Sequence, residues 1–186
     1  MTKLNVSIPT LETERLILRG FEESDLDAMA AMYADADNMR FIGGAQPVHE
    51  VWRRIAASIG HWAMRGFGFM AVVEKSSGDF VGQCGPLRPH AWPENEIGYS
   101  FRRDAQGQGY ATEAARASLA YAYRDLGWET AISVIDSENF ASQGVAKKLG
   151  ATKEQTDVSI WDFTADIWRH LPPEDFFKSN PSTSLN

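Results

Sequence analysis

The chain has 186 residues and a formal net charge of −7, because 25 Asp and Glu residues outnumber 18 Lys and Arg residues. Its composition, 44% hydrophobic and 23% charged, is that of an ordinary globular protein, which argues against disorder. The acidic balance argues against non-specific nucleic-acid binding. A single cysteine, Cys84, excludes an intrachain disulfide and a multi-cysteine zinc site, and the scattered histidines show no metal-ligand spacing, so no metal site is predicted.

The length and the hydropathy pattern indicate one soluble domain. The first residues lack the apolar segment of a secretory signal, and no apolar run approaches the ~20 residues of a membrane span, so we expect a cytoplasmic protein without membrane contact. The domain is expected over residues 1–171. After two prolines the sequence becomes polar, and residues 172–186 are predicted to form a polar C-terminal tail.

The apolar pattern predicts strands and helices in a mixed order. Strands are expected at residues 13–19, 69–73, 80–84, 96–101, 130–135 and 161–167, and helices at residues 24–33, 48–65, 109–126 and 141–149. The hairpin turn at residues 76–79 indicates an antiparallel first half, and the helix between two later strands indicates one β-α-β unit, so the fold class is mixed α/β. Trp52 and Trp62 are expected in the core, and Cys84 is expected to be a small buried apolar residue.

A glycine-rich segment, Gln106-Gly-Gln-Gly-Tyr-Ala111, lies between a predicted strand and a predicted helix. Alternate glycines let backbone N–H groups point the same way, and a helix N-terminus follows directly, so the segment is suited to an anion. Arg102, Arg103 and Arg116 add positive charge nearby. A plain glycine-rich turn is the alternative. Thr112 occupies the position of the third glycine of a dinucleotide fingerprint, and no Gly-Lys-Ser/Thr run exists, which excludes both common nucleotide motifs.

The pattern Gln-x-x-Gly-x-Ala resembles the pyrophosphate-binding signature of the GNAT superfamily of N-acetyltransferases. Further segments are similar to the branch of Rim-type ribosomal-protein acetyltransferases, in the expected order over roughly residues 11–170: Leu11-Glu-Thr-Glu-Arg-Leu-Ile-Leu-Arg19, Glu96-Ile-Gly-Tyr99, Gly109-Tyr-Ala-Thr-Glu-Ala-Ala-Arg116, Asn139-Phe-Ala-Ser142 and Lys148-Leu-Gly150. The resemblance implies a central mixed, mostly antiparallel sheet of about seven strands flanked by about four helices.

The resemblance also implies acetyl-coenzyme A as the co-substrate. Backbone amides of the glycine-rich segment would hold the pyrophosphate, and the pantetheine arm would lie between the strands at 96–101 and 130–135, which should splay apart. The residues implied in donor binding are Ser100, Phe101, Arg103, Gln106, Gly107, Gln108, Gly109, Tyr110, Ala111, Thr112, Asn139 and Ser142. Lys147 and Lys148 either reach the adenosine-side phosphates or form a solvated helix face.

Acetyl transfer to an amine requires that an ammonium group lose a proton before it attacks the thioester. Glu96, at the head of the central strand, is the candidate base, acting through a water; a solvent-exposed edge glutamate is the alternative. Tyr99 is a candidate for orienting substrate or donating a proton, although its alternation with Ile97 and Phe101 favours core packing. Many family members carry a tyrosine that protonates the leaving thiolate, and Ala146 stands at that position here.

The function implied by the resemblance is transfer of an acetyl group from acetyl-CoA to a primary amine. The Rim-type branch favours a protein N-terminal amine, while a small amine such as an amino acid, a polyamine or a drug stays open, since all are cationic and the acidic charge does not choose. A non-catalytic CoA-binding regulatory module is the alternative of another class, and Ala146 is its only support. Phe41 and Trp92 flank the expected acceptor mouth. Dimers are common in the family, so a homodimer is one open arrangement.

Overall fold

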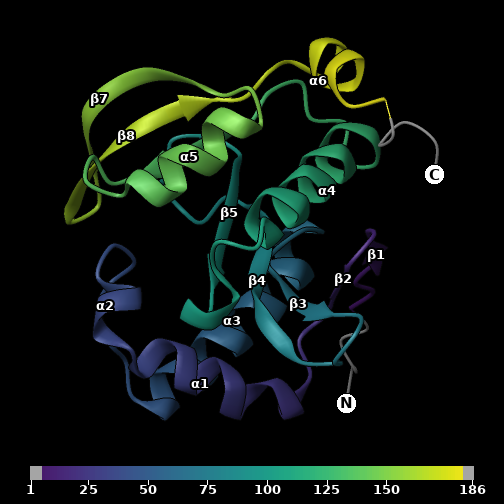
Figure 1. Ribbon diagram of the computed structural model, residues 1–186. Coiled ribbons are helices and arrows are strands. Elements are labelled where there is room, and N and C mark those ends of the chain that lie inside the picture. Colours follow the sequence, from purple (N-terminus) through teal and green to yellow (C-terminus); the bar gives the residue numbers. More distant parts are fainter. Residues whose placement is uncertain (1–5, 182–186) are drawn as a thin grey trace.

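A computed structural model describes residues 6–181, which form one eight-stranded sheet with helices on both faces (Figure 1). The strands are β1 (Leu11–Glu12), β2 (Leu16–Arg19), β3 (Met70–Glu74), β4 (Phe80–Leu87), β5 (Glu96–Phe101), β6 (Ile132–Ile135), β7 (Thr152–Ile160) and β8 (Phe163–Arg169). The helices are α1 (Leu26–Ala34), α2 (Ala36–Met39), α3 (Val48–Arg65), α4 (Tyr110–Arg124), α5 (Phe140–Lys148) and α6 (Pro173–Ser179), with 3-10 turns at Glu23–Asp25 and Arg103–Ala105.

The sheet is mixed and mostly antiparallel, as the sequence predicts. Its order is β1-β2-β3-β4-β5-β6-β8-β7, and only the pair β5–β6 is parallel. The sheet has eight strands, one more than expected. The edge strand β7 is difficult to recognise in the sequence, because its side chains are almost all exposed up to its last residue, Ile160. A strand at the sheet edge without a buried face carries no hydrophobic alternation, and so the sequence pattern does not reveal it.

The parallel pair β5–β6 is joined by α4, which is the predicted β-α-β unit. Its register contains one Cα pair, Glu96 with Ile132. Beyond that pair the two strands run in the same direction without further pairing, so they diverge toward Tyr99 on β5 and Ile135 on β6. The expected splay between these strands is confirmed, and it leaves backbone hydrogen-bonding groups of both strands unused by the sheet.

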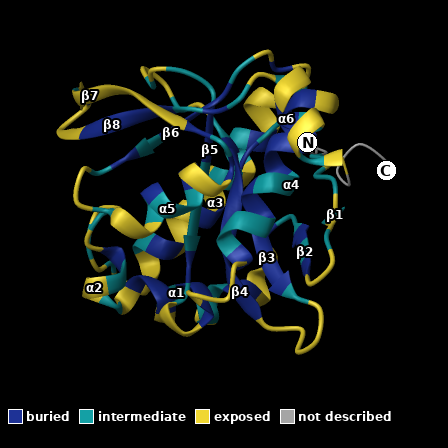
Figure 2. Cartoon of the chain, turned by 45° about the horizontal axis from the view of Figure 1, so that its top comes forward, coloured by how far each residue is buried: buried dark blue, intermediate teal, exposed yellow. Residues whose placement is uncertain are grey.

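Helix α4 covers one face of the sheet through small side chains. Four of these, Ala114, Ala115, Ser118 and Ala122, are 0% exposed, as is the larger Leu119. Figure 2 shows α4 beside the dark blue, buried strands β3 and β4. Small residues let the helix axis approach the strands closely, so that the start of α4 is held at the end of β5.

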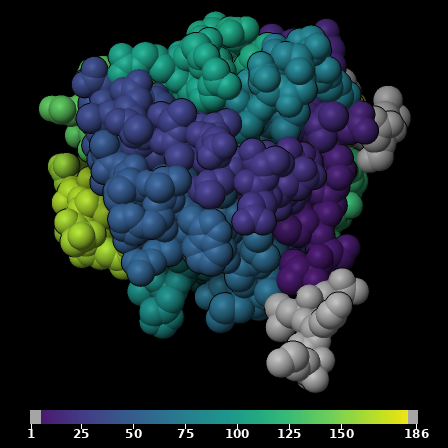
Figure 3. All heavy atoms as spheres, turned by 90° about the horizontal axis from the view of Figure 1, so that it is seen from below, coloured from purple at the N-terminus to yellow at the C-terminus, as the bar shows by residue number. Residues whose placement is uncertain are grey.

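Helices α1, α2 and α3 cover the other face. Their buried residues, Met29, Met32, Tyr33, Met39, Val51 and Ile55, form one cluster with Ala71 of β3 and Phe80 of β4. Figure 3 shows this face, with the purple and blue N-terminal residues across its centre. Trp62 is 4% exposed, as expected, but the prediction for Trp52 is wrong, because it is 53% exposed. The helix turns about 100° per residue, and with Val51 and Ile55 on the sheet side the adjacent Trp52 points outward.

The predicted polar tail is wrong for residues 173–179, which form α6. Phe176 is 0% exposed and packs edge-to-face against Tyr123 of α4, with ring centroids 5.5 Å apart. The two aromatic residues Phe176 and Phe177, inside an otherwise polar stretch, are the signal of this packing. The end of the predicted tail, residues 182–186, lies outside the described residues. Within residues 6–181, none of the helices has the length and apolar character that crossing a bilayer requires.

Candidate active site

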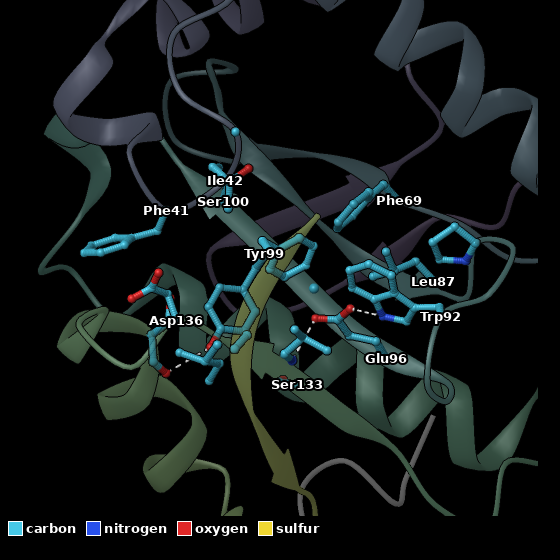
Figure 4. A pocket seen from close by; sticks show the side chains of 18 of the residues that line it. Phe41, Ile42, Phe69, Leu87, Trp92, Glu96, Tyr99, Ser100, Ser133 and Asp136 are labelled. Carbon is cyan, nitrogen blue, oxygen red and sulfur yellow. Dashed lines mark hydrogen bonds between the residues drawn. The ribbon is translucent and has the colours of Figure 1, made fainter. Parts of the chain in front are cut away.

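A cavity of about 810 Å³ opens where β5 and β6 diverge. Its floor is formed by β5, its sides by α3, by residues 40–43 after α2 and by the start of α5, and its far rim by the turn between β7 and β8. Figure 4 shows Tyr99 in the middle of this space, with Phe41 on one side and Phe69, Leu87 and Trp92 on the other. Phe41 and Trp92 therefore both line the cavity.

Glu96 is a buried carboxylate on the cavity floor rather than an exposed residue at a strand edge. Its side chain accepts a hydrogen bond from the indole Nε1 of Trp92 at 2.6 Å and another from the backbone amide of Val134 at 3.0 Å. Burial raises the pKa of Glu96 to about 7, and these two donors oppose the rise only in part. A carboxyl group with this pKa takes up and releases a proton near neutral pH, which is what a general base requires.

Tyr99 both lines the cavity and packs against the core. Its neighbours in the alternating pattern, Ile97 and Phe101, are buried in the main hydrophobic cluster, and Tyr99 is partly buried against that cluster. The phenol hydroxyl donates a hydrogen bond to the backbone oxygen of Ser142 in α5 at 3.0 Å. Burial raises the pKa of Tyr99, so the hydroxyl keeps its proton at neutral pH.

The glycine-rich segment forms a turn of exposed backbone before α4. Gly107 and Gly109 have φ angles of 77° and 85°, in the left-handed region that favours glycine. The backbone N–H groups of residues 107–112 make no hydrogen bond within the described part of the chain, whereas the N–H of Glu113 is the first to bond to a helical carbonyl, that of Gly109. These free donors and the positive end of the α4 dipole point to one anion site.

Several side chains that the sequence implied in donor binding serve to hold this turn in place. The guanidinium of Arg103 forms an ion pair with Asp35 at 2.7 Å, and the side-chain amide of Gln106 donates to Asn38 at 2.6 Å. The side-chain amide of Gln108 donates to the backbone oxygen of Asp104, in the preceding 3-10 turn, at 3.1 Å. These contacts tie the turn to α2, so the free groups of the segment are its backbone amides.

Arg15 is a further residue at this turn that the sequence analysis did not single out. Its guanidinium donates to the backbone oxygen of Gln108 at 2.9 Å, pairs with Glu113 at 2.6 Å and lies 4.6 Å from the ring centroid of Tyr110. Tyr110 is buried, and its hydroxyl donates to Glu74. Only the fold brings β2 beside the start of α4, and no local sequence signal links Arg15 to the glycine-rich segment.

Asn139 and Ser142 line the cavity at the start of α5. The side-chain Oδ1 of Asn139 accepts a hydrogen bond from the backbone amide of Ser142 at 3.1 Å and so caps the helix. Its Nδ2 has no hydrogen-bond partner among residues 6–181. Ala146 is 0% exposed in a cluster with Ile135 and Trp168, so this position supplies no acid and faces no solvent.

The structure also tests the expectation for the single cysteine. Cys84 is 0% exposed, and burial raises the pKa of its thiol to about 12, which confirms the prediction of a buried apolar role. Over residues 6–181, no group of three or more His, Cys, Asp or Glu side chains is placed to hold a metal ion.

Comparison with known proteins identifies the family of the fold. The acetyltransferase (GNAT) domain model matches residues 15–152. The uncharacterized protein YkkB of Bacillus subtilis is 32% identical over 160 residues, which cover 82% of this chain and 90% of that protein. The crystal structure of an acetyltransferase from Agrobacterium tumefaciens superposes with a TM-score of 0.81 at 29% identity, covering 92% of this chain and 99% of the other. The ribosomal L7/L12 α-N-protein acetyltransferase RimL, solved with coenzyme A, has the same fold, with a TM-score of 0.69 at 17% identity and coverage of 87% and 96%.

Proposed function

Because this chain belongs to the GNAT family of acetyltransferases, we propose that it acetylates a primary amine in the cavity between β5 and β6, with Glu96 as the base. It is an acetyl-CoA-dependent N-acetyltransferase by family. The observation that carries the assignment of the site is the position of Glu96. Its buried carboxyl group, with a pKa of about 7, lies on the cavity floor at the one residue pair that joins β5 to β6, where the two strands begin to diverge.

We place the donor across the splay and the glycine-rich turn. The free amides of residues 107–112 and the α4 N-terminus suit the doubly charged pyrophosphate of acetyl-CoA. Beyond the contacts of Val134 with Glu96 and of Ser133 with Ile97, the facing edges of β5 and β6 make no strand pair, and they suit the amide groups of the pantetheine arm, which would add to the sheet as a strand does. Asn139 has its Nδ2 free to donate to that arm while its Oδ1 caps α5. In this arrangement the thioester reaches the cavity near Tyr99.

The chemistry requires a neutral amine, a stabilised oxyanion and a proton for the leaving thiolate. Glu96 takes the proton of the ammonium, directly or through one water, and the amine nitrogen then attacks the thioester carbonyl. Backbone N–H groups of β5 beyond the Glu96 pair are suited to the oxygen that becomes negative. Tyr99 keeps its hydroxyl protonated and lies beside Ser142, and Ala146 stands where many family members have the acid tyrosine, so we assign to Tyr99 the proton donated to the thiolate. The proton that the attacking nitrogen releases as the amide forms replaces it on the phenol oxygen.

Three alternatives remain: a protein N-terminal amine as the acceptor, a small amine as the acceptor, and a CoA-binding module without turnover. The fold shared with RimL supports a protein N-terminal amine, and a cavity of about 810 Å³ is large enough for a small amine. A CoA-binding module without turnover would keep the glycine-rich turn but would have no use for a base with a pKa of about 7. That residue therefore favours an enzyme.

The test combines binding and turnover on the intact chain. Calorimetric titration with acetyl-CoA measures donor binding, and release of the CoA thiol measures transfer to a panel of small amines and N-terminal peptides. We expect donor binding and acceptor-dependent thiol release, with Glu96→Gln retaining the first and losing most of the second. Donor binding without thiol release on any acceptor would instead support the regulatory module.

A further inference from the structure

Two arginines line the cavity without a carboxylate partner. Arg54 of α3 donates to Gln46 at 2.5 Å and lies 5.1 Å from the ring centroid of Tyr33, and Arg40 lies 4.4 Å from that of Phe41. Neither arginine forms an ion pair with any residue that the structure describes. The neighbouring Arg53 on the same helix, which does not line the cavity, pairs with Glu50 at 2.9 Å. In a chain of net charge −7, two guanidinium groups of the cavity lining that pair with no carboxylate among the described residues are available to an anion.

A second part of the cavity lining is an aromatic wall. The ring of Trp92 packs 5.0 Å from that of Trp161 and 5.9 Å from that of Phe163. Phe41, next to Arg40, lies across Tyr99 from Trp92 (Figure 4). Side chains of this size and flatness take an apolar or aromatic ligand body.

The turn that carries Trp161 is held in an uncommon backbone conformation. Trp161 has a φ of 51° and is 61% exposed, and its Nε1 donates to the backbone oxygen of His90 at 3.2 Å. Ala91, beside His90, has a φ of 59°. The left-handed backbone conformation is unfavourable for residues other than glycine unless their surroundings hold them in it. The hydrogen bond from Trp161 to His90 joins the β7–β8 turn to the segment before β5 at the rim of the cavity, while the Trp161 side chain stays largely exposed.

The acidic groups of the cavity come from other elements than the arginines. Glu96 lies on β5, Asp136 follows β6 and Asp162 lies in the β7–β8 turn, and none is within ion-pair distance of Arg40 or Arg54. Asp136 already accepts a hydrogen bond from the amide of Glu138, and His61 is engaged by backbone groups on either side of its ring. The cavity thus offers both signs of charge to one ligand, together with an aromatic surface.

We propose that the acceptor amine carries a carboxylate on the same small molecule and an aromatic or large apolar body, as a free amino acid or a short peptide acid does. The inference rests on the proposed function and names the substrate class of the same site. The amine lies at Glu96, the carboxylate at Arg54 with Arg40, and the body against Trp92 and Trp161. A polyamine fits less well, because its second cation would meet the two arginines.

The experiment compares acceptors that differ only in the carboxylate. L-Tryptophan, L-phenylalanine and L-leucine are each paired with the amine that lacks the carboxyl group, and tryptophanyl-glycine with its C-terminal amide. Thiol release gives kcat/KM, and calorimetric titration of the CoA-loaded protein gives binding without turnover. We expect at least one acid to exceed its counterpart by roughly 10- to 100-fold, the effect of a charge-assisted pair. The free amino acids and the dipeptide separate the two sources of the carboxylate.

Arg54→Gln and Arg53→Gln form the matched pair of variants. Arg54→Gln should remove most of the preference by raising KM for the acid while leaving the kinetics of its counterpart without a carboxylate unchanged, and Arg53→Gln should leave both unchanged. Equal kcat/KM for acid and counterpart throughout the panel, a better result with spermidine, or an equal loss on both in Arg54→Gln would overturn the inference while leaving acetyl transfer intact. Arg54-dependent binding of an acid without thiol release would support the inference and contradict the proposed catalysis. Absence of binding by every acid would overturn it.

Discussion

The indole nitrogen of Trp92 donates a hydrogen bond to the carboxylate of Glu96 at 2.6 Å, from a loop that precedes β5 by a few residues. The same carboxylate accepts a hydrogen bond from the backbone amide of Val134, on β6, at 3.0 Å. Two donors on either side of the splay therefore fix the direction of the proposed base toward the cavity. The indole of Trp92 therefore holds the Glu96 carboxylate in place and also belongs to the aromatic wall of the proposed acceptor space.

The first prediction concerns the backbone of the glycine-rich turn. Gly109→Ala places a methyl group where the pyrophosphate is proposed to approach, at a φ of 85° that disfavours a side chain. We expect acetyl-CoA affinity to fall by at least roughly 10-fold, the equivalent of about 1.4 kcal/mol. Gly127→Ala is the control, because Gly127 has a φ of 67° and its added Cβ would meet nothing within 4 Å. Calorimetric titration should show the loss in the first variant alone, with similar decreases of Tm in both; equal affinities would remove the donor from this turn.

The second prediction separates two roles of Asn139. Asn139→Ala removes both the cap of α5 and the free amide donor, so it should lower stability by about 1 kcal/mol and also weaken donor binding. Asn139→Asp keeps an acceptor for the amide of Ser142 but has no N–H group. We expect its Tm to stay close to that of the parent while the Kd for acetyl-CoA rises roughly 2- to 13-fold, from a lost hydrogen bond of about 0.5–1.5 kcal/mol. An unchanged Kd in the aspartate variant would restrict Asn139 to capping.

The parts of the fold that follow from local pattern were predictable from the sequence. Glycine spacing at residues 106–111 and the period of α4 predict an exposed glycine-rich turn between a strand and a helix, and the alternation around Ile97 marks β5. The position of Arg15 beside that turn and the pairing of Trp92 with Glu96 depend on contacts between distant elements, which periodicity does not encode. Trp52 shows the same limit, since its helical stripe was recognised but the side of the stripe that meets the sheet was not.

The third prediction concerns the position of the missing family tyrosine. Ala146 is 0% exposed against Ile135 and Trp168, so the cluster has no space for a phenol ring. Ala146→Tyr should destabilise the protein by about 1–3 kcal/mol through overpacking and should not raise kcat. Gly144→Ala on the same helix serves as the folding control, since its Cβ meets nothing within 4 Å and alanine favours the helix. Urea unfolding and thiol release measure the two effects; a stable Ala146→Tyr enzyme with a higher kcat would show that this position still serves the leaving thiolate.

The fourth prediction concerns the titration of Glu96, whose pKa burial raises from 4.5 to about 7. Between these values the folded protein holds a proton that the unfolded chain has lost, so the contribution of Glu96 to stability is fully present below pH 4.5 and is lost as the pH rises through 7. The full shift corresponds to about 3 kcal/mol. Glu96→Gln has no such titration, and we expect its stability relative to the parent to increase from pH 4 to pH 8. Glu94→Gln is the control with the opposite pH dependence, because the hydrogen bond from Arg169 lowers the pKa of Glu94. The contribution of Glu94 to stability is therefore present above pH 4.5 and is lost as the pH falls below that value.

The same group predicts the pH dependence of the reaction. If Glu96 is the base, kcat/KM of the parent enzyme should rise through pH 7 as the carboxyl group loses its proton, in addition to the rise from the acceptor amine itself. Glu96→Gln should lose the limb near pH 7 and about 10²–10⁴-fold in rate, with donor binding unchanged. The deficit should shrink at high pH, where free amine no longer needs a base. Glu94→Gln should keep the limb near pH 7. Thiol release from pH 5.5 to 9.5 measures all three proteins, and a limb near pH 7 that persists in Glu96→Gln would assign the proton transfer to another group.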